Sequence, residues 1–180
     1  HSTLEPKAML LMEEVLNDAF TQQDANRIWE VIEKRRLIEL YPLKLGNQIP
    51  INQHTLDNAF LKRLAQKAPQ QQLLDRQKLA GYIPKGSALL QSLQTKEHHY
   101  FVISTSNTIH QMKLSNPSSA AAKKIFINEL TSWISDREIK HLFFGSRLHQ
   151  QPGTEFIHKN IGDELPKLRQ FNQISLTHLA

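Results

Sequence analysis

EHHYFVISTSNTIHQMKLSNPSSAAAKKIFINELTSWISDREIKHLFFG, residues 97–145, is the stretch that decides the fold. Within it, the segments from Tyr100 to Thr105 and from Ile109 to Leu114 are rich in β-branched and aromatic residues. They flank the turn residues Ser106 and Asn107. Two such segments around a short turn predict a β-hairpin.

An amphipathic helix is predicted directly after this hairpin. We expect Asn116 to cap it and Pro117 to occupy its first position, because both residue types are favoured there. Its apolar face consists of Ala122, Ile125, Phe126, Leu130, Trp133 and Ile134. The apolar run from Ile139 to Phe144, closed by Gly145, then predicts a strand that is covered on both faces.

The residues before this stretch have a mainly helical pattern. Apolar residues recur at three and four residue steps, and helices are expected at residues 5–20, from an N-cap at Thr21 through 37, and at 55–68 and 71–80. Residues 88–93 read as one or two further helical turns. A last helix is expected from Asp163 to Phe171, with Pro166 in its first turn.

These elements predict an α+β (or α/β) protein with two lobes. Residues 1–93 would form a helical lobe that could resemble a helix-turn-helix unit. This lobe is basic from 34 to 85. Residues 94–180 would form a small α/β lobe, in which the amphipathic helix packs on a sheet made of the hairpin and at least one further strand.

Composition excludes several classes of protein. The chain has no cysteine, which removes disulfides and thiolate chemistry, and no apolar run approaches the roughly 20 residues that span a bilayer. No dinucleotide-binding loop and no serine-hydrolase elbow is present. We therefore expect a soluble, cytoplasmic protein without a cofactor, a metal site or a membrane contact.

Charge is distributed unevenly along the chain, whose formal net charge is +5. Residues 1–33 hold two basic residues against seven acidic ones, whereas residues 34–85 hold ten basic residues against three acidic ones. Such a basic segment suits a surface that meets phosphate, or one that meets an acidic protein. The candidate nucleic-acid-binding residues are Lys34, Arg35, Arg36, Lys44, Lys62, Arg63 and Lys67.

Ser146 and Arg147 are candidates for binding an anion. They follow the predicted strand that ends at Gly145, and ligands of open α/β sheets bind beyond the carboxyl ends of strands. Arginine and serine side chains could hold a phosphate or a carboxylate there. The alternative is a plain turn that ends the strand, and a single glycine falls well short of a phosphate-loop motif.

Other polar residues are better explained as ordinary strand or surface residues than as metal ligands or catalytic groups. His98 and His99 are adjacent on a predicted strand, so their side chains point to opposite faces and do not chelate one ion. Glu138 and Lys140, near Asp136, have the spacing found in metal-dependent nucleases, but the hairpin from Tyr100 to Leu114 holds no acidic residue to complete such a site. No catalytic residue is therefore assigned.

The sequence leaves three functions open. The first is a non-enzymatic module whose basic helical surface contacts DNA or RNA. The second is a protein-interaction domain whose basic face meets an acidic partner or the acidic first helix. The third and weakest is an enzyme that acts on an anionic, phosphate-bearing substrate.

Overall fold

A computed structural model describes residues 6–44, 76–145 and 153–174 of the chain. The helices are α1 (Pro6–Thr21), α2 (Ala25–Lys44), α5 (Arg76–Ala80), α6 (Ala120–Asp136) and α7 (Glu155–Glu164). The strands are β1 (Ser87–Gln94), β2 (His99–Ser104), β3 (Ile109–Leu114), β4 (His141–Gly145) and β5 (Arg169–Ile174). The expected α+β class is confirmed.

The strands form one mixed sheet in the order β3-β2-β1-β4-β5. The first three make an antiparallel meander, and the β2–β3 pair is the predicted hairpin. β4 pairs in parallel with β1, and β5 pairs in parallel with β4. β1 therefore lies at the centre, where an antiparallel half and a parallel half of the sheet meet.

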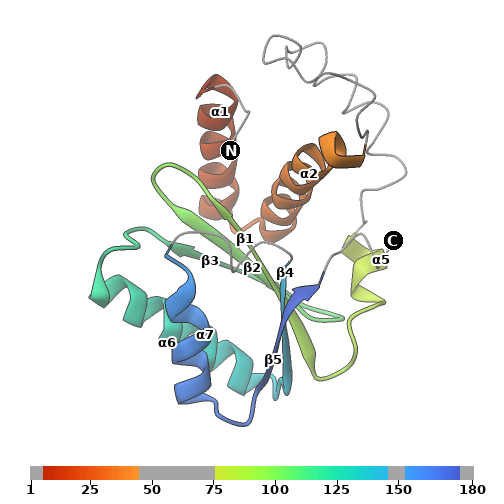
Figure 1. The fold of residues 1–180 in the computed structure, drawn as a ribbon, viewed down its shortest axis with the longest axis vertical. Helices are drawn as coiled ribbons and strands as arrows, with labels where there is room; N and C mark the ends of the chain where they lie inside the picture. The colour runs from red at the N-terminus through yellow and green to blue at the C-terminus, as the bar shows by residue number, and fades with distance from the viewer. Residues whose placement is uncertain (1–5, 45–75, 146–152, 175–180) are drawn as a thin grey trace.

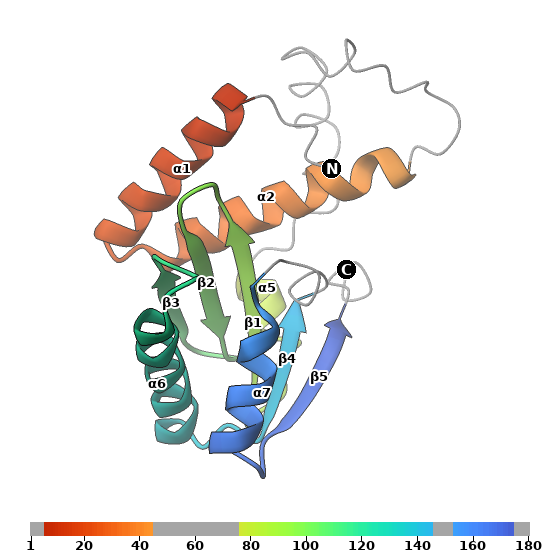
Figure 2. The same cartoon turned by 60° about the vertical axis from the view of Figure 1, so that its left-hand side comes forward.

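The sheet separates two layers of helices, α1 with α2 on one face and α6 with α7 on the other (Figures 1 and 2). Because successive side chains of a strand point to opposite faces, neighbours on β1 and β2 enter different hydrophobic clusters. Leu89 and Tyr100 pack in the cluster with α1 and α2. Leu90 and Phe101 pack in the cluster with α6 and α7.

α1 ends in a turn that also starts α2. Gln23 has a φ of 56°, its N–H donates to the Phe20 carbonyl, and the Asp24 N–H donates to the Ala19 carbonyl. These two bonds form a Schellman C-cap. The Asp24 carboxylate then accepts from the Arg27 N–H, so Asp24 is the N-cap of α2.

The predicted cap at Thr21 is therefore wrong. Thr21 is the last residue of α1, and its hydroxyl donates to the carbonyl of Asn17 in its own helix. The aspartate three residues later is the stronger cap because its carboxylate reaches the free N–H groups of the first turn of α2.

The start of α6 also differs from expectation. Ser119 is the N-cap and accepts from the Ala122 N–H, whereas Asn116 and Pro117 lie in the preceding turn. The Asn116 side chain accepts from the Ser118 N–H, and this local bond holds the turn instead of capping a helix. The apolar face is as predicted for Phe126, Leu130, Trp133 and Ile134, but Ile125 is exposed.

The helical interpretation of residues 88–93 is wrong, because these residues form the greater part of β1. Leu89, Leu90 and Leu93 have a spacing that fits a helix as well as a strand. A central strand covered on both faces needs no alternation of polar and apolar residues, so its pattern resembles that of a buried helix. The lobe boundary expected between residues 93 and 94 consequently falls inside β1.

The last predicted helix, from Asp163 to Phe171, is also wrong. α7 covers Glu155–Glu164, and β5 follows from Arg169. Pro166 lies in the turn between them. α7 buries Ile157 and Ile161. The helix predicted at residues 55–68 lies outside the described residues.

Candidate functional site

Four of the predicted basic residues lie on α2, which is a single helix from Ala25 to Lys44. Lys34 is exposed and Arg35 is half-buried. Arg36 and Lys44 belong to the same helix, but their side chains are outside the described part of the structure. The basic segment therefore starts on a helix that is anchored to the sheet at its other end.

The sheet-facing side of α2 explains why Lys34 is exposed. Ile28, Trp29 and Ile32 are buried in the cluster with α1 and the strands. Successive helical residues are separated by about 100°, so Lys34 lies about 200° around the helix from Ile32. Its ammonium group consequently faces away from the sheet, and no ion pair of Lys34 is found among the described residues.

Glu33 lies next to Lys34 in sequence but on the buried side of α2. Its carboxylate Oε1 accepts from Nε2 of Gln91, on β1, at 3.0 Å, and both residues are buried. The Oε1 atom of Gln91 is sealed from solvent and has no hydrogen-bond partner among the described residues. This polar pair joins α2 to the central strand.

The Glu33–Gln91 pair lies level with the end of β4. Leu90 pairs with Phe144, so Gln91 lies beside Gly145. A Cβ atom on Gly145 would stand 3.2 Å from Cγ of Gln91 and 3.4 Å from the Leu90 carbonyl oxygen. Gly145 therefore allows β4 to lie close to β1. This close approach is a structural reason for a glycine at this position.

The carboxyl ends of β1, β4 and β5 lie at one edge of the sheet, because these strands are parallel. Figures 1 and 2 both show the second half of α2 on the side to which β4 and β5 point. Ser146 and Arg147 follow β4 in the sequence, but they lie outside the described residues. Lys62, Arg63 and Lys67 lie outside them too, so these five residues stay predictions.

The nuclease-like residues lie at the opposite edge of the sheet. Glu138 is an exposed residue with a φ of 52° that follows α6, and Lys140 immediately precedes β4, at its amino end. The backbone N–H of Lys140 donates to the carbonyl of Gly86 just before β1. None of β1, β2 and β3 carries an acidic residue. Among the described residues, no other carboxylate is grouped with Glu138 closely enough to hold a metal ion.

In the part of the chain that the structure describes, the histidines do not converge on one site. His98 contacts Glu13 of α1, whereas the buried His99 stacks on Phe101 on the other face. His110 contacts Glu129 of α6. His141 lies on β4 and stacks on Phe171 of β5, and His149 is outside the described residues.

No protein-family model matches the chain, and no curated protein is significantly similar to it. The site must therefore be interpreted from its own residues. No helix among the described residues is long and apolar enough to cross a membrane.

Sequence reasoning missed Glu33 and Gln91. Glu33 was counted only as one of the acidic residues before the basic segment. Its place on the apolar face could have been found, because it follows Ile32 directly and Trp29 by four residues. Gln91 carried no such signal, since its strand resembled a helix.

Proposed function

We propose that this chain is a non-enzymatic module that binds nucleic acid through the basic surface that α2 begins. Lys34, Arg35, Arg36 and Lys44 would supply the cations on the helix, and Lys62, Arg63 and Lys67 would continue the surface. Each cation would contact phosphate, so binding would be dependent on salt and would not by itself read sequence.

The observation that carries this proposal is the division of α2 into two sides. Its buried side chains, among those described, are Ala25, Ile28, Trp29, Ile32 and Glu33, and they attach the helix to the rest of the protein. Lys34 lies on the opposite side of the helix and is exposed. The basic stretch that starts there is therefore presented by a helix fixed to a folded core.

The diameter of an α-helix suits a nucleic-acid groove. An α-helix with its side chains is roughly 10 to 12 Å across, and the major groove of duplex DNA is about 12 Å wide. The side of the molecule that holds the second half of α2 is also the side on which β4 ends, before Ser146 and Arg147. A phosphate bound by these two residues would extend the same surface.

The experiment is fluorescence anisotropy with labelled duplex DNA and single-stranded RNA at about 50 and 200 mM salt, a range over which phosphate contacts weaken strongly. The test variant is Lys34→Ala with Arg36→Ala. The control variant is Lys124→Ala with Lys159→Ala, which removes the same charge from α6 and α7. Both control lysines are exposed, so neither substitution should disturb the core.

We expect the wild-type protein and the control to bind with the same steep salt dependence. The test variant should bind severalfold more weakly, and the slope of log affinity against log salt should fall by roughly 1 to 2. Equal affinity of the test and control variants would contradict the proposed surface. No binding of either nucleic acid by the wild type would overturn the function itself.

A protein-interaction surface is the second candidate function. Leu10 and Leu11 on α1 are 63% and 62% exposed, and exposed neighbouring leucines are more typical of a contact surface than of a solvated helix. An acidic protein that binds the basic residues would also be sensitive to salt. A competition experiment separates the two candidates. If the chain binds a protein and not nucleic acid, duplex DNA will not displace that protein.

A further inference from the structure

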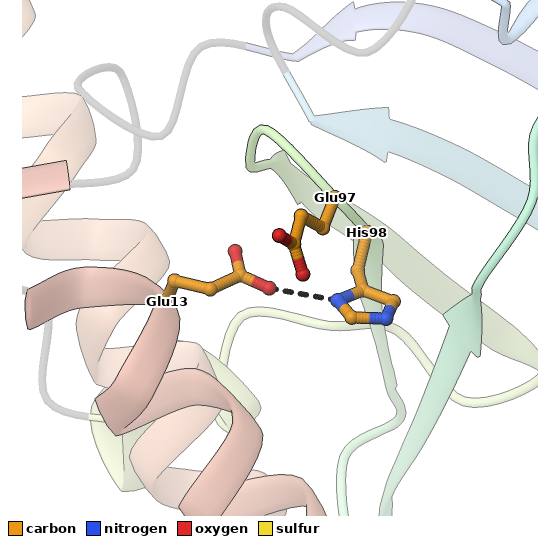
Figure 3. A group of neighbouring side chains, drawn as sticks. All are labelled: Glu13, Glu97 and His98. Carbon is orange, nitrogen blue, oxygen red and sulfur yellow. Dashed lines mark hydrogen bonds and ion pairs between the residues drawn. The ribbon is translucent and has the colours of Figure 1, made fainter. Parts of the chain in front are cut away.

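Three metal-ligating side chains converge where α1 meets the turn between β1 and β2. Glu13 comes from α1, and Glu97 and His98 come from the turn (Figure 3). One ligand atom of each residue lies within 4.8 Å of the others. Glu13 and His98 are 85 positions apart, so only the folded chain brings them together.

The contacts of Glu13 are incomplete. Its Oε1 atom lies 2.7 Å from Nδ1 of His98 and accepts a longer bond of 3.4 Å from the Tyr100 hydroxyl. Its Oε2 atom is sealed from solvent and has no hydrogen-bond partner among the described residues. Buried carboxylate oxygens normally have a partner, so this atom is one that a bound cation could satisfy.

The turn holds His98 in place before any ligand arrives. Thr95 donates to the His98 carbonyl through both its N–H and its hydroxyl, at 2.8 and 2.9 Å, and the His98 N–H donates back to the hydroxyl at 3.1 Å. Glu97 is exposed and can change rotamer without disturbing the core. The site is thus two fixed ligands and one adjustable ligand.

The donor set favours a particular class of ion. Two carboxylates face one imidazole, so the group carries a negative formal charge whether His98 is neutral or protonated. Imidazole nitrogen suits zinc, iron, copper and nickel, while magnesium and calcium prefer oxygen alone. Zn²⁺ accepts both histidine nitrogen and glutamate oxygen at roughly 2.0 to 2.2 Å.

We propose that Glu13, Glu97 and His98 bind a divalent transition-metal ion, with Zn²⁺ the best match, and that the ion clamps α1 to the β1–β2 turn. The ion replaces the proton between Nδ1 of His98 and Oε1 of Glu13, and the Oε2 atom of Glu13, which lacks a hydrogen-bond partner among the described residues, is the second carboxylate oxygen available to it. Two ligand atoms on one Zn²⁺ stand roughly 3 to 3.5 Å apart, so the 2.7 Å separation of Nδ1 and Oε1 widens only slightly.

The test is titration of the full chain with Zn²⁺ at pH 7, followed with a competing zinc dye. Glu97→Gln is the main variant, because its exposed side chain can be changed without affecting folding. Glu129→Gln is the matched control. Glu129 also pairs with a histidine, His110, at 3.0 Å, but the described residues place no second carboxylate there.

We expect one equivalent of Zn²⁺ to bind the wild type and the control with equal affinity. Glu97→Gln should weaken binding by at least about tenfold, as loss of a ligand does. Equal affinity of Glu97→Gln and the wild type would overturn the proposal. So would a wild type that binds no Zn²⁺ up to about 1 mM, an affinity too weak for a built site.

A second readout tests the histidine ligand and the clamp. Co²⁺ bound in place of Zn²⁺ should give visible absorption bands in the wild type that are absent in His98→Gln. Saturating Zn²⁺ should raise the melting temperature of the wild type and of Glu129→Gln, because an ion that binds only the folded chain stabilises it. An equal rise in His98→Gln would contradict a clamp made by these residues.

Discussion

The acidity of Tyr100 is strongly changed by its surroundings. Its ring is fully buried between α1 and the sheet, and its hydroxyl donates to Glu13. Burial, the charge of Glu13, the hydrogen bond to Glu13 and the charge of Glu97 all raise the pKa of Tyr100 well above its ordinary value. Folding therefore holds this phenol in its neutral form.

This shift predicts a loss of stability in alkali. The unfolded tyrosine releases its proton near pH 10, while the folded one keeps it, so the stabilising contribution is complete below that pH and is lost as the pH rises further. We expect the difference in free energy of unfolding between the wild type and Tyr100→Phe to shrink between pH 9 and 11, a range around that unfolded value. Urea unfolding at each pH measures it.

The exposed Tyr82 supplies the control for this experiment. Tyr82 is 52% exposed, so Tyr82→Phe removes a tyrosine hydroxyl without opening the core. A difference between the wild type and Tyr100→Phe that does not depend on pH would contradict the raised pKa of Tyr100.

At the residue scale, the sequence is informative where helix geometry alone decides whether a side chain is exposed. The exposure of Lys34 follows from the apolar spacing of α2, which the sequence displays. The contact between Glu13 and His98 could not be predicted, because 85 residues separate them and no local pattern links them. The buried Glu33 lies between these cases, since its position was visible but its partner Gln91 was not.

The end of α6 can be stabilised by a substitution at Glu138. The Glu138 N–H donates to Ser135 and the Ile139 N–H donates to Ile134, which forms a Schellman motif with Glu138 in the left-handed position. Residues with a Cβ atom are strained there. We expect Glu138→Gly to raise the free energy of unfolding by about 0.5 to 1 kcal/mol, measured by thermal or urea unfolding.

Two variants separate this backbone effect from the loss of a charge. Glu138→Ala removes the same carboxylate but keeps a Cβ atom, so it should not stabilise the protein. Gln23→Gly should stabilise it as Glu138→Gly does, because Gln23 occupies the equivalent position at the end of α1, with a φ of 56°. A stabilising Glu138→Ala would show that charge, and not conformation, is responsible.

Helices and strands could be predicted where the apolar residues recur with a clear period or where a short turn separates two strand-like segments. The hairpin and α6 have such patterns, and both are present. β1 was mistaken for a helix because Leu89 and Leu90 both needed burial, on opposite faces, which removes the alternation that marks a strand. The region of α7 and β5 was misread because Pro166 was assigned to the start of a helix, whereas it follows the end of one.

At the scale of the whole molecule, the strand order could not be derived from the sequence. Only the hairpin pairing is local, and the parallel pairing of β1 with β4 joins segments separated by the hairpin and α6. The direction in which β4 runs, and so the side of the sheet at which it ends, depends on that pairing. The relation between this edge and α2 is consequently a result of the fold, although each of the two segments was singled out from its residues.

The central position of β1 predicts that the two helical layers unfold together. β1 and β2 contribute alternate side chains to both hydrophobic clusters, so the loss of either layer exposes one face of the strands on which the other layer depends. Trp29 lies in the cluster with α1 and α2, and Trp133 lies in the cluster with α6 and α7. The chain has two tryptophans, so each layer carries its own fluorescent reporter.

Trp29→Phe and Trp133→Phe therefore leave one reporter each. In each variant, urea unfolding followed by tryptophan fluorescence should give the same midpoint as unfolding followed by far-ultraviolet circular dichroism, as in a cooperative two-state transition. Because both tryptophans are buried, each substitution lowers the midpoint as a whole, and the comparison is therefore made between two probes of one protein. If the Trp29 signal were lost before the circular dichroism signal, the layer of α1 and α2 would unfold independently, as the two-lobe division of the sequence implies.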